Sequence, residues 1–271
     1  MRQVPKAVVG MKLHDFARRK NTEKITVLTC YDYPSAKMVA ASQLDCVLVG
    51  DSVAMAVHGH QTTLMADIEM MVTHTAAVSR GIGPQFVIAD LPFLGHRGSR
   101  ETTMTQVKRL AQAGAHALKI EGGDEDTCAT IQYIITSGVP VMGHIGLTPQ
   151  SLLQLGGYKV QGRSDNQAQQ LLDQARRLEA AGCFALVLEC IPSALAKLIT
   201  AELKIPTIGI GAGSDTDGQV LVWHDFLGLY SDINSRFVKQ FMDGKALFKE
   251  AINRYASEVQ QKEFPSTEHM F

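Results

Sequence analysis

An alternation of short apolar segments and helix-like segments runs through most of this 271-residue chain. The apolar segments are apolar on both faces and are bounded by polar turns, a pattern that predicts parallel β-strands buried beneath helices. We expect eight strands, at 25–31, 45–51, 86–91, 117–121, 140–145, 185–189, 206–211 and 219–223.

Helix-like segments fill most of the intervals between these strands. Capping residues support two of them: Ser99 precedes the helix at 100–114, and Gly114 and Gly182 close the helices at 100–114 and 166–182. Eight strand-and-helix units fit a single-domain (β/α)8 TIM barrel, an α/β fold. A doubly wound open sheet satisfies the same local pattern and is the alternative. We expect helices at 34–43, 66–80, 100–114, 125–137, 166–182 and 193–203, and a long terminal helix at 234–261.

No linker or break in composition divides the chain. We therefore expect residues 1–271 to form one barrel domain. A helical extension at about 1–24 would precede the barrel, and a helix and tail at about 234–271 would follow it.

Charge and cysteine content limit the classes of function. With a formal net charge of -1, the chain gives no reason to expect nucleic acid or a membrane surface as a partner. The five cysteines are scattered and form no C-x-x-C pair, which is typical of reduced core residues. Neither a signal peptide nor a run of ~18 apolar residues is present, so we expect a cytoplasmic protein.

Carboxylates stand at the carboxyl ends of three predicted strands. Asp51 closes VLVGD, Asp90 closes FVIAD and Glu121 closes ALKIE. Barrel active sites lie at this rim, and oxygen ligands of this kind suit Mg²⁺. We therefore predict a magnesium site at these three residues. The alternative for each is structural: a helix N-cap for either Asp, or a solvated turn residue for Glu121.

Three further ionisable residues share the predicted rim. Lys119 points to the same side of its strand as Glu121, either as an anchor for a substrate carboxylate or as a salt-bridge filler. Glu189, in the apolar segment ALVLEC, suits a general base, although a buried structural role is the rival. His144 is a candidate substrate contact that donates to a developing oxyanion, or it merely fills the barrel mouth.

Two glycine-rich loops carry weaker signals. The segment GIGAG at 209–213 follows the seventh strand and would bind a phosphate or form a tight turn. The segment GGYKVQGR at 156–163 contains Lys159 and Arg163, which suggests a lid, an anion contact or an ordinary surface loop.

Ten segments in order along the chain match one known family. They are CYDYPSAK (30–37), LVGDS (48–52), HTAAVSRG (74–81), ADLPF (89–93), KIEGG (119–123), GHIGLTPQS (143–151), GGYKVQGR (156–163), LVLECIP (186–192), GIGAG (209–213) and FPSTEHMF (264–271). Through them the chain resembles the ketopantoate hydroxymethyltransferase family over nearly its whole length.

The resemblance implies a (β/α)8 barrel that assembles as a homodecamer. It implies transfer of a hydroxymethyl group from 5,10-methylenetetrahydrofolate to 3-methyl-2-oxobutanoate, giving 2-dehydropantoate in pantothenate and coenzyme A biosynthesis. Position by position, it implies Mg²⁺ at Asp51, Asp90 and Glu121, the 2-oxo acid at Asp51, Ser52, Asp90 and Lys119, and the proton acceptor at Glu189.

The same residues are compatible with an enolate mechanism. Mg²⁺ would polarise the keto acid and stabilise the enolate that forms when Glu189 removes the C3 proton, while Lys119 balances the substrate carboxylate. A magnesium-dependent C–C lyase of the phosphoenolpyruvate mutase and isocitrate lyase type would use this chemistry without folate. The loop at 209–213 would also suit an enzyme that acts on phosphorylated ligands. A non-catalytic sensor would keep the pocket but would have no need of Lys119 or Glu189.

Overall fold

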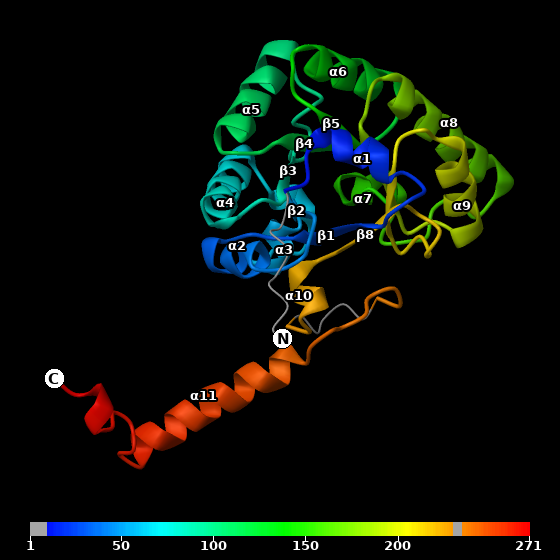
Figure 1. Ribbon diagram of the computed structural model, residues 1–271. Coiled ribbons are helices and arrows are strands. Elements are labelled where there is room, and N and C mark those ends of the chain that lie inside the picture. Colours follow the sequence, from blue (N-terminus) through cyan, green and yellow to red (C-terminus); the bar gives the residue numbers. More distant parts are fainter. Residues whose placement is uncertain (1–9, 230–234) are drawn as a thin grey trace, which may run out of the picture. The chain divides into compact units, whose positions relative to one another are not determined.

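A computed structural model describes residues 10–229 and 235–271. Contacts divide the chain into two compact units, Met1–Val222 and Trp223–Phe271. In the first unit, eight parallel strands pair in chain order and close on themselves through pairing of β8 with β1 (Figure 1). The closed barrel confirms the predicted fold class and excludes the open, doubly wound sheet.

The strands lie within two residues of their predicted bounds, because continuous apolar segments between polar turns mark buried parallel strands clearly. They are β1 (Ile25–Thr29), β2 (Cys46–Val49), β3 (Phe86–Asp90), β4 (Ala117–Glu121), β5 (Val141–Gly146), β6 (Ala185–Glu189), β7 (Thr207–Ile210) and β8 (Gly218–Leu221).

Six longer helices surround the barrel, as predicted (Figure 1). They are α2 (Tyr33–Ala40), α4 (Ile68–Gly81), α5 (Arg100–Gln112), α6 (Glu125–Thr136), α8 (Asp165–Ala180) and α9 (Ser193–Glu202). Five of them begin after an Asp or Ser whose side chain accepts a backbone N–H of the first turn, including the predicted cap Ser99. Gly114 and Gly182 follow two helices with positive φ, as expected for glycines at helix ends.

Several short helices and 3₁₀ turns lie in the loops. The sequence did not predict them, because three or four residues are too few to show a helical period. They are α3 (Val53–Ala56), α7 (Leu152–Leu155), and the 3₁₀ turns η1 (Thr63–Met65) and η2 (Pro149–Ser151). Residues 211–217 join β7 to β8 without a helix. In this loop Gly211 and Gly213 have positive φ, which fits the tight-turn interpretation of GIGAG.

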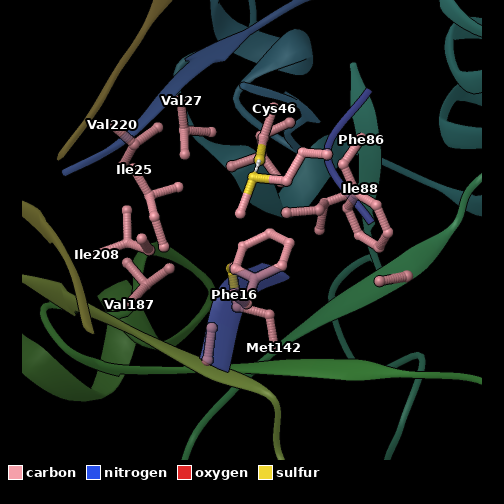
Figure 2. Close-up of a cluster of buried hydrophobic side chains, with 14 of the residues drawn as sticks. Phe16, Ile25, Val27, Cys46, Phe86, Ile88, Met142, Val187, Ile208 and Val220 are labelled. Carbon is pink, nitrogen blue, oxygen red and sulfur yellow. Dashed lines mark hydrogen bonds between the residues drawn. The ribbon is translucent and has the colours of Figure 1, made fainter. Parts of the chain in front are cut away.

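The barrel core lies toward the amino ends of the strands (Figure 2). Inward side chains such as Ile25, Val27 and Ile88 recur at every second strand position and are almost fully buried. Helix α1 (Leu13–Arg19) adds Phe16, which packs edge-on against Phe86 with ring centroids 5.3 Å apart. This apolar plug leaves the opposite end of the barrel for the polar site.

The second unit contains α10 (Trp223–Phe226), α11 (Gly244–Gln260) and the 3₁₀ turn η3 (Thr267–His269). The prediction that the terminal helix starts near 234 is wrong: α11 begins at Gly244, after Asp243, whose side chain accepts the Ala246 N–H. Residue 234 itself lies outside the described residues.

The predicted amino-terminal extension contains α1, and residues 1–9 of it lie outside the described residues. A single domain over 1–271 stays a prediction. The five cysteines are free thiols, three of them buried. Among the described residues, no helix is long and apolar enough to span a membrane, and the cytoplasmic location stays a prediction.

Candidate active site

Polar side chains replace apolar ones at the carboxyl ends of the strands. Ile88 is followed two positions later by Asp90, Ala117 by Lys119, and Met142 by His144. Because side chains two positions apart share one face of a strand, these polar groups continue the inward face of the barrel above its apolar core. The side chains of the three ionisable residues are at most 5% exposed.

Lys119 lies at the centre of the polar group. Its Nζ is 3.1 Å from Asp90 Oδ1, 3.7 Å from Glu121 Oε1 and 3.1 Å from His144 Nδ1. Burial acts to lower the pKa of Lys119, but the surrounding carboxylates outweigh that effect and raise it. Lys119 is therefore a buried cation that stays charged.

Asp51 follows β2 in the turn that leads into α3. Its backbone N–H donates to Asp90 Oδ2 at 2.9 Å, which explains why the two acidic residues lie together. Burial, and then the charges of Asp90 and Glu121, raise the pKa of Asp51 well above its usual value. The proposed N-cap alternative does not hold, because Asp51 Oδ2 accepts from the Gln150 side chain instead.

Gln150 joins two of the carboxylates. Its Nε2 donates to Asp51 Oδ2 at 2.8 Å and to the Leu91 carbonyl at 3.0 Å, and its backbone N–H donates to Glu121 Oε2 at 2.9 Å. Glu121 is thus buried and bonded rather than a solvated turn residue. Sequence reasoning did not single out Gln150. Its place in GHIGLTPQS, just after the fifth strand, was the available signal.

Glu189 lies near the other acidic residues, with His144 between them. His144 Nε2 lies 3.2 Å from Glu189 Oε2, and His144 Nδ1 lies 3.4 Å from Glu121 Oε1. Burial and the Lys119 charge act to lower the pKa of His144, but the neighbouring carboxylates of Glu121 and Glu189 raise it to about 9. The imidazole therefore connects the general-base candidate with the acidic group, and does more than fill the barrel mouth.

Ser52 lies at the edge of this arrangement. Its Oγ forms a 2.8 Å hydrogen bond with the Tyr31 hydroxyl, and burial raises the pKa of that phenol. A contact between Ser52 and a substrate stays a prediction.

The charges at the rim suit a divalent cation. Four carboxylates face the two cationic groups Lys119 and His144, and the buried oxygens Asp90 Oδ1 and Glu121 Oε1 accept no well-directed hydrogen bond from the described residues. No three His, Cys, Asp or Glu side chains in the described ranges are spaced to enclose an ion by themselves. Mg²⁺ takes one or two protein carboxylates and completes its shell with water and substrate, so the residues fit it.

A closed parallel barrel with buried acids, a lysine and a further carboxylate at the carboxyl rim defines a (β/α)8 enzyme that acts on a small molecule. Residues 10–267 match the family of ketopantoate hydroxymethyltransferases. The chain belongs to this family, and is thereby a hydroxymethyltransferase of pantothenate biosynthesis.

Relatives support this placement. A 3-methyl-2-oxobutanoate hydroxymethyltransferase of Legionella pneumophila strain Paris is 64% identical over 262 residues, which cover 96% of this chain and 100% of the relative. The enzyme of the same description from Francisella tularensis subsp. tularensis strain FSC 198 is 50% identical and covers 98% of both chains.

A solved structure agrees in fold alone. The crystal structure of 2,3-dimethylmalate lyase, a member of the phosphoenolpyruvate mutase and isocitrate lyase superfamily, has a TM-score of 0.59 at 15% identity. The match covers 96% of this chain and 91% of the lyase.

Proposed function

We propose that this barrel transfers a hydroxymethyl group from 5,10-methylenetetrahydrofolate to 3-methyl-2-oxobutanoate, giving 2-dehydropantoate, and that Asp51, Asp90 and Glu121 hold Mg²⁺ for this reaction. Family membership supports the reaction, and the excess of buried carboxylates supports the cation. When bound, Mg²⁺ would supply Lewis-acid polarisation of the keto group.

The substrate carboxylate is assigned to the Lys119 ammonium. This cation is held in place by Asp90 at 3.1 Å and by its burial, so it is already oriented before substrate arrives. Asp51 and Ser52, which directly precede α3, complete the proposed oxo acid site.

Glu189 is assigned the proton abstraction. The C3–H bond of the oxo acid breaks, the proton passes to a Glu189 carboxylate oxygen, and the electron pair enters the enolate. His144, 3.2 Å from Glu189 Oε2, holds the base in position. In the folate, the methylene carbon bridges two nitrogens, and protonation of one of them breaks its C–N bond and leaves an iminium on the other. C3 forms a bond to this carbon while the electron pair of the C=N bond returns to nitrogen. Water then forms a C–O bond to the carbon as the remaining C–N bond breaks, the freed nitrogen takes a proton, and the hydroxymethyl group results.

One observation carries this proposal: the buried Lys119, surrounded by acids, lies one imidazole away from Glu189. An anion anchor next to a base is what enolisation of a 2-oxo acid requires. The test follows solvent exchange of the substrate C3 proton by NMR, with Mg²⁺ and without folate. Glu189→Gln should abolish most of the exchange, whereas Glu101→Gln on exposed α5 should not; exchange unchanged in Glu189→Gln would remove Glu189 from this role.

Omitting single components separates the proposed transfer from a C–C lyase. Product should form only when 3-methyl-2-oxobutanoate, methylenetetrahydrofolate and Mg²⁺ are all present. A lyase would instead cleave its substrate with folate omitted. Family membership favours the transferase.

We also propose that the chain forms a homo-oligomer, a decamer by resemblance to its family. Helix α11 supports association, because Leu247, Ile252 and Tyr255 are each more than half exposed on it. Light scattering coupled to size-exclusion chromatography gives the assembly size. A monomer at micromolar concentration would contradict this part of the proposal.

A further inference from the structure

A cavity of about 540 Å³ lies beside the cluster of buried acidic residues at the barrel rim. Glu121, Gly146 and Gln150 contribute to its lining on the side of the barrel. Gly146 is paired in register with Glu189, so the cavity reaches the strand position next to the proposed base. Its volume exceeds what a small oxo acid needs and falls in the range of drug-sized ligands.

The lining is rich in neutral hydrogen-bonding groups. Gln167, Gln170 and Gln174 of α8 line it, at helical spacings of three and four that put them on one face. A carboxamide carries both donors and an acceptor. This wall therefore suits a ligand whose edge alternates donors and acceptors.

His96 is the polar group in this lining that most clearly points to a ligand. His96 is one of the residues that line the cavity and is only 7% exposed; its two ring nitrogens are themselves buried and have no hydrogen-bond partner among the described residues. Burial lowers the pKa of His96 to about 4, so near neutrality the ring offers one donor and one acceptor. Buried polar groups are nearly always paired, and a ligand in this cavity would pair with the ring once the ring turns toward it.

A second cavity of about 700 Å³ adjoins the first, since Leu155, Gln161 and Gln167 line both. Lys159 and Arg163 of the segment 156–163 line this outer cavity, and none of its lining residues is acidic. Neither cation forms an ion pair with any described residue. The outer cavity is thus cationic, whereas the α8 wall of the inner one is neutral.

We propose that these adjoining cavities bind the one-carbon donor, a reduced folate, with its pterin ring against His96 and the α8 glutamines and its glutamate carboxylates against Lys159 and Arg163. The pterin is a flat, uncharged ring system with donors and acceptors along one edge, and it matches the inner cavity with its neutral wall. The tail is anionic, and it matches the cationic outer cavity. This inference rests on the proposed function, since that function supplies the folate.

The inner cavity is tested with His96→Phe. Phenylalanine keeps a ring of similar size but removes both nitrogens, and the affinity for tetrahydrofolate, measured by isothermal titration calorimetry, should fall about fivefold to tenfold. The unfolding temperature should not fall, because no hydrogen bond within the protein is lost. A merely structural histidine would give the opposite pair of results: lowered stability and unchanged affinity.

The outer cavity is tested with Lys159→Gln and Arg163→Gln, both at surface positions. Each should weaken tetrahydrofolate binding about threefold to tenfold, and should weaken less the binding of tetrahydropteroate, which lacks both glutamate carboxylates and keeps only its benzoate carboxylate. Lys108→Gln on α5 is the matched control, because that lysine lines neither cavity. The affinity of this variant for tetrahydrofolate should equal that of the unchanged protein.

Folate-free C3 proton exchange separates failure of the folate site from failure of the proposed function. If the unchanged protein catalyses exchange and binds tetrahydrofolate, but all three variants retain its affinity, the folate site is wrong and the proposed function stands. If the unchanged protein shows neither exchange nor hydroxymethyl transfer, the proposed function fails and this inference falls with it.

Discussion

His144 and Glu189 face each other from neighbouring strands, with the imidazole Nε2 3.2 Å from the carboxylate Oε2. The other ring nitrogen lies 3.4 Å from Glu121 Oε1, so one buried imidazole lies between the proposed base and a proposed metal ligand. This geometry makes His144 a positioning residue whose loss should affect both the proton abstraction and the cation site.

His144→Phe should lower the rate of C3 proton exchange about tenfold to a hundredfold, the usual effect of removing a group that orients a catalytic or metal-binding residue. His144→Gln, which can still donate to one carboxylate, should recover part of the rate. NMR exchange and unfolding temperatures are measured on both variants. Equal exchange rates for Phe and Gln, at equal stability, would contradict a positioning role.

Gln150→Leu should weaken the apparent affinity for Mg²⁺ about tenfold to a hundredfold. The change removes the side-chain donor to Asp51 Oδ2 and leaves the backbone bond to Glu121 intact, so Asp51 loses its orientation while Glu121 keeps its own. Titration of activity with Mg²⁺ measures the shift. Gln132→Leu, on the exposed side of α6, is the control. An unchanged magnesium midpoint would show that Gln150 does not organise the cation site.

Phe16→Ala should lower the free energy of unfolding by about 3–5 kcal/mol, because it empties the amino-terminal plug of the barrel. Phe16 is fully buried and contacts the rings of Phe86 and Phe184, with centroids 5.3 and 4.8 Å away. Urea unfolding measures the effect. Leu13→Ala in the same helix removes a side chain that is 39% exposed and should cost far less. Equal losses would mean that α1 does not close the barrel.

The rim residues were predictable because their signal is local. Asp90, Lys119, Glu121 and His144 stand on strands whose apolar pattern is clear, and the two-residue period places their side chains inward. The consecutive order of strands then brings them together. Strand bounds, most helices and the acidic group followed from this logic alone.

Gln150 and His96 were not predictable in the same way, because they stand in loops. Their side chains are placed by turns such as the positive φ of Leu94, and by partners distant in sequence, including Asp51. The prediction of where α11 starts was wrong for a related reason. Apolar residues precede Gly244, and only the Asp243 cap marks where the helix begins.

Asp217→Asn should lower the free energy of unfolding at pH 7 by about 3 kcal/mol, since it breaks a buried ion pair whose Lys20 Nζ lies 2.8 Å away. Burial acts to raise the pKa of Asp217, but bonds from Lys20 and from the Thr207 and Asn21 backbones lower it below its usual value. A lowered folded-state pKa means that this stability is present above the unfolded-state pKa of about 3.9 and is lost as pH falls through the lower folded value. Urea unfolding from pH 7 to pH 3 should therefore show the two proteins converging in acid. Asp215→Asn is the control, because Asp215 lies in the same loop but forms an exposed pair with Lys197, and its free energy of unfolding should fall by less than about 1 kcal/mol. A pH-independent difference for Asp217→Asn would refute the ion-pair explanation.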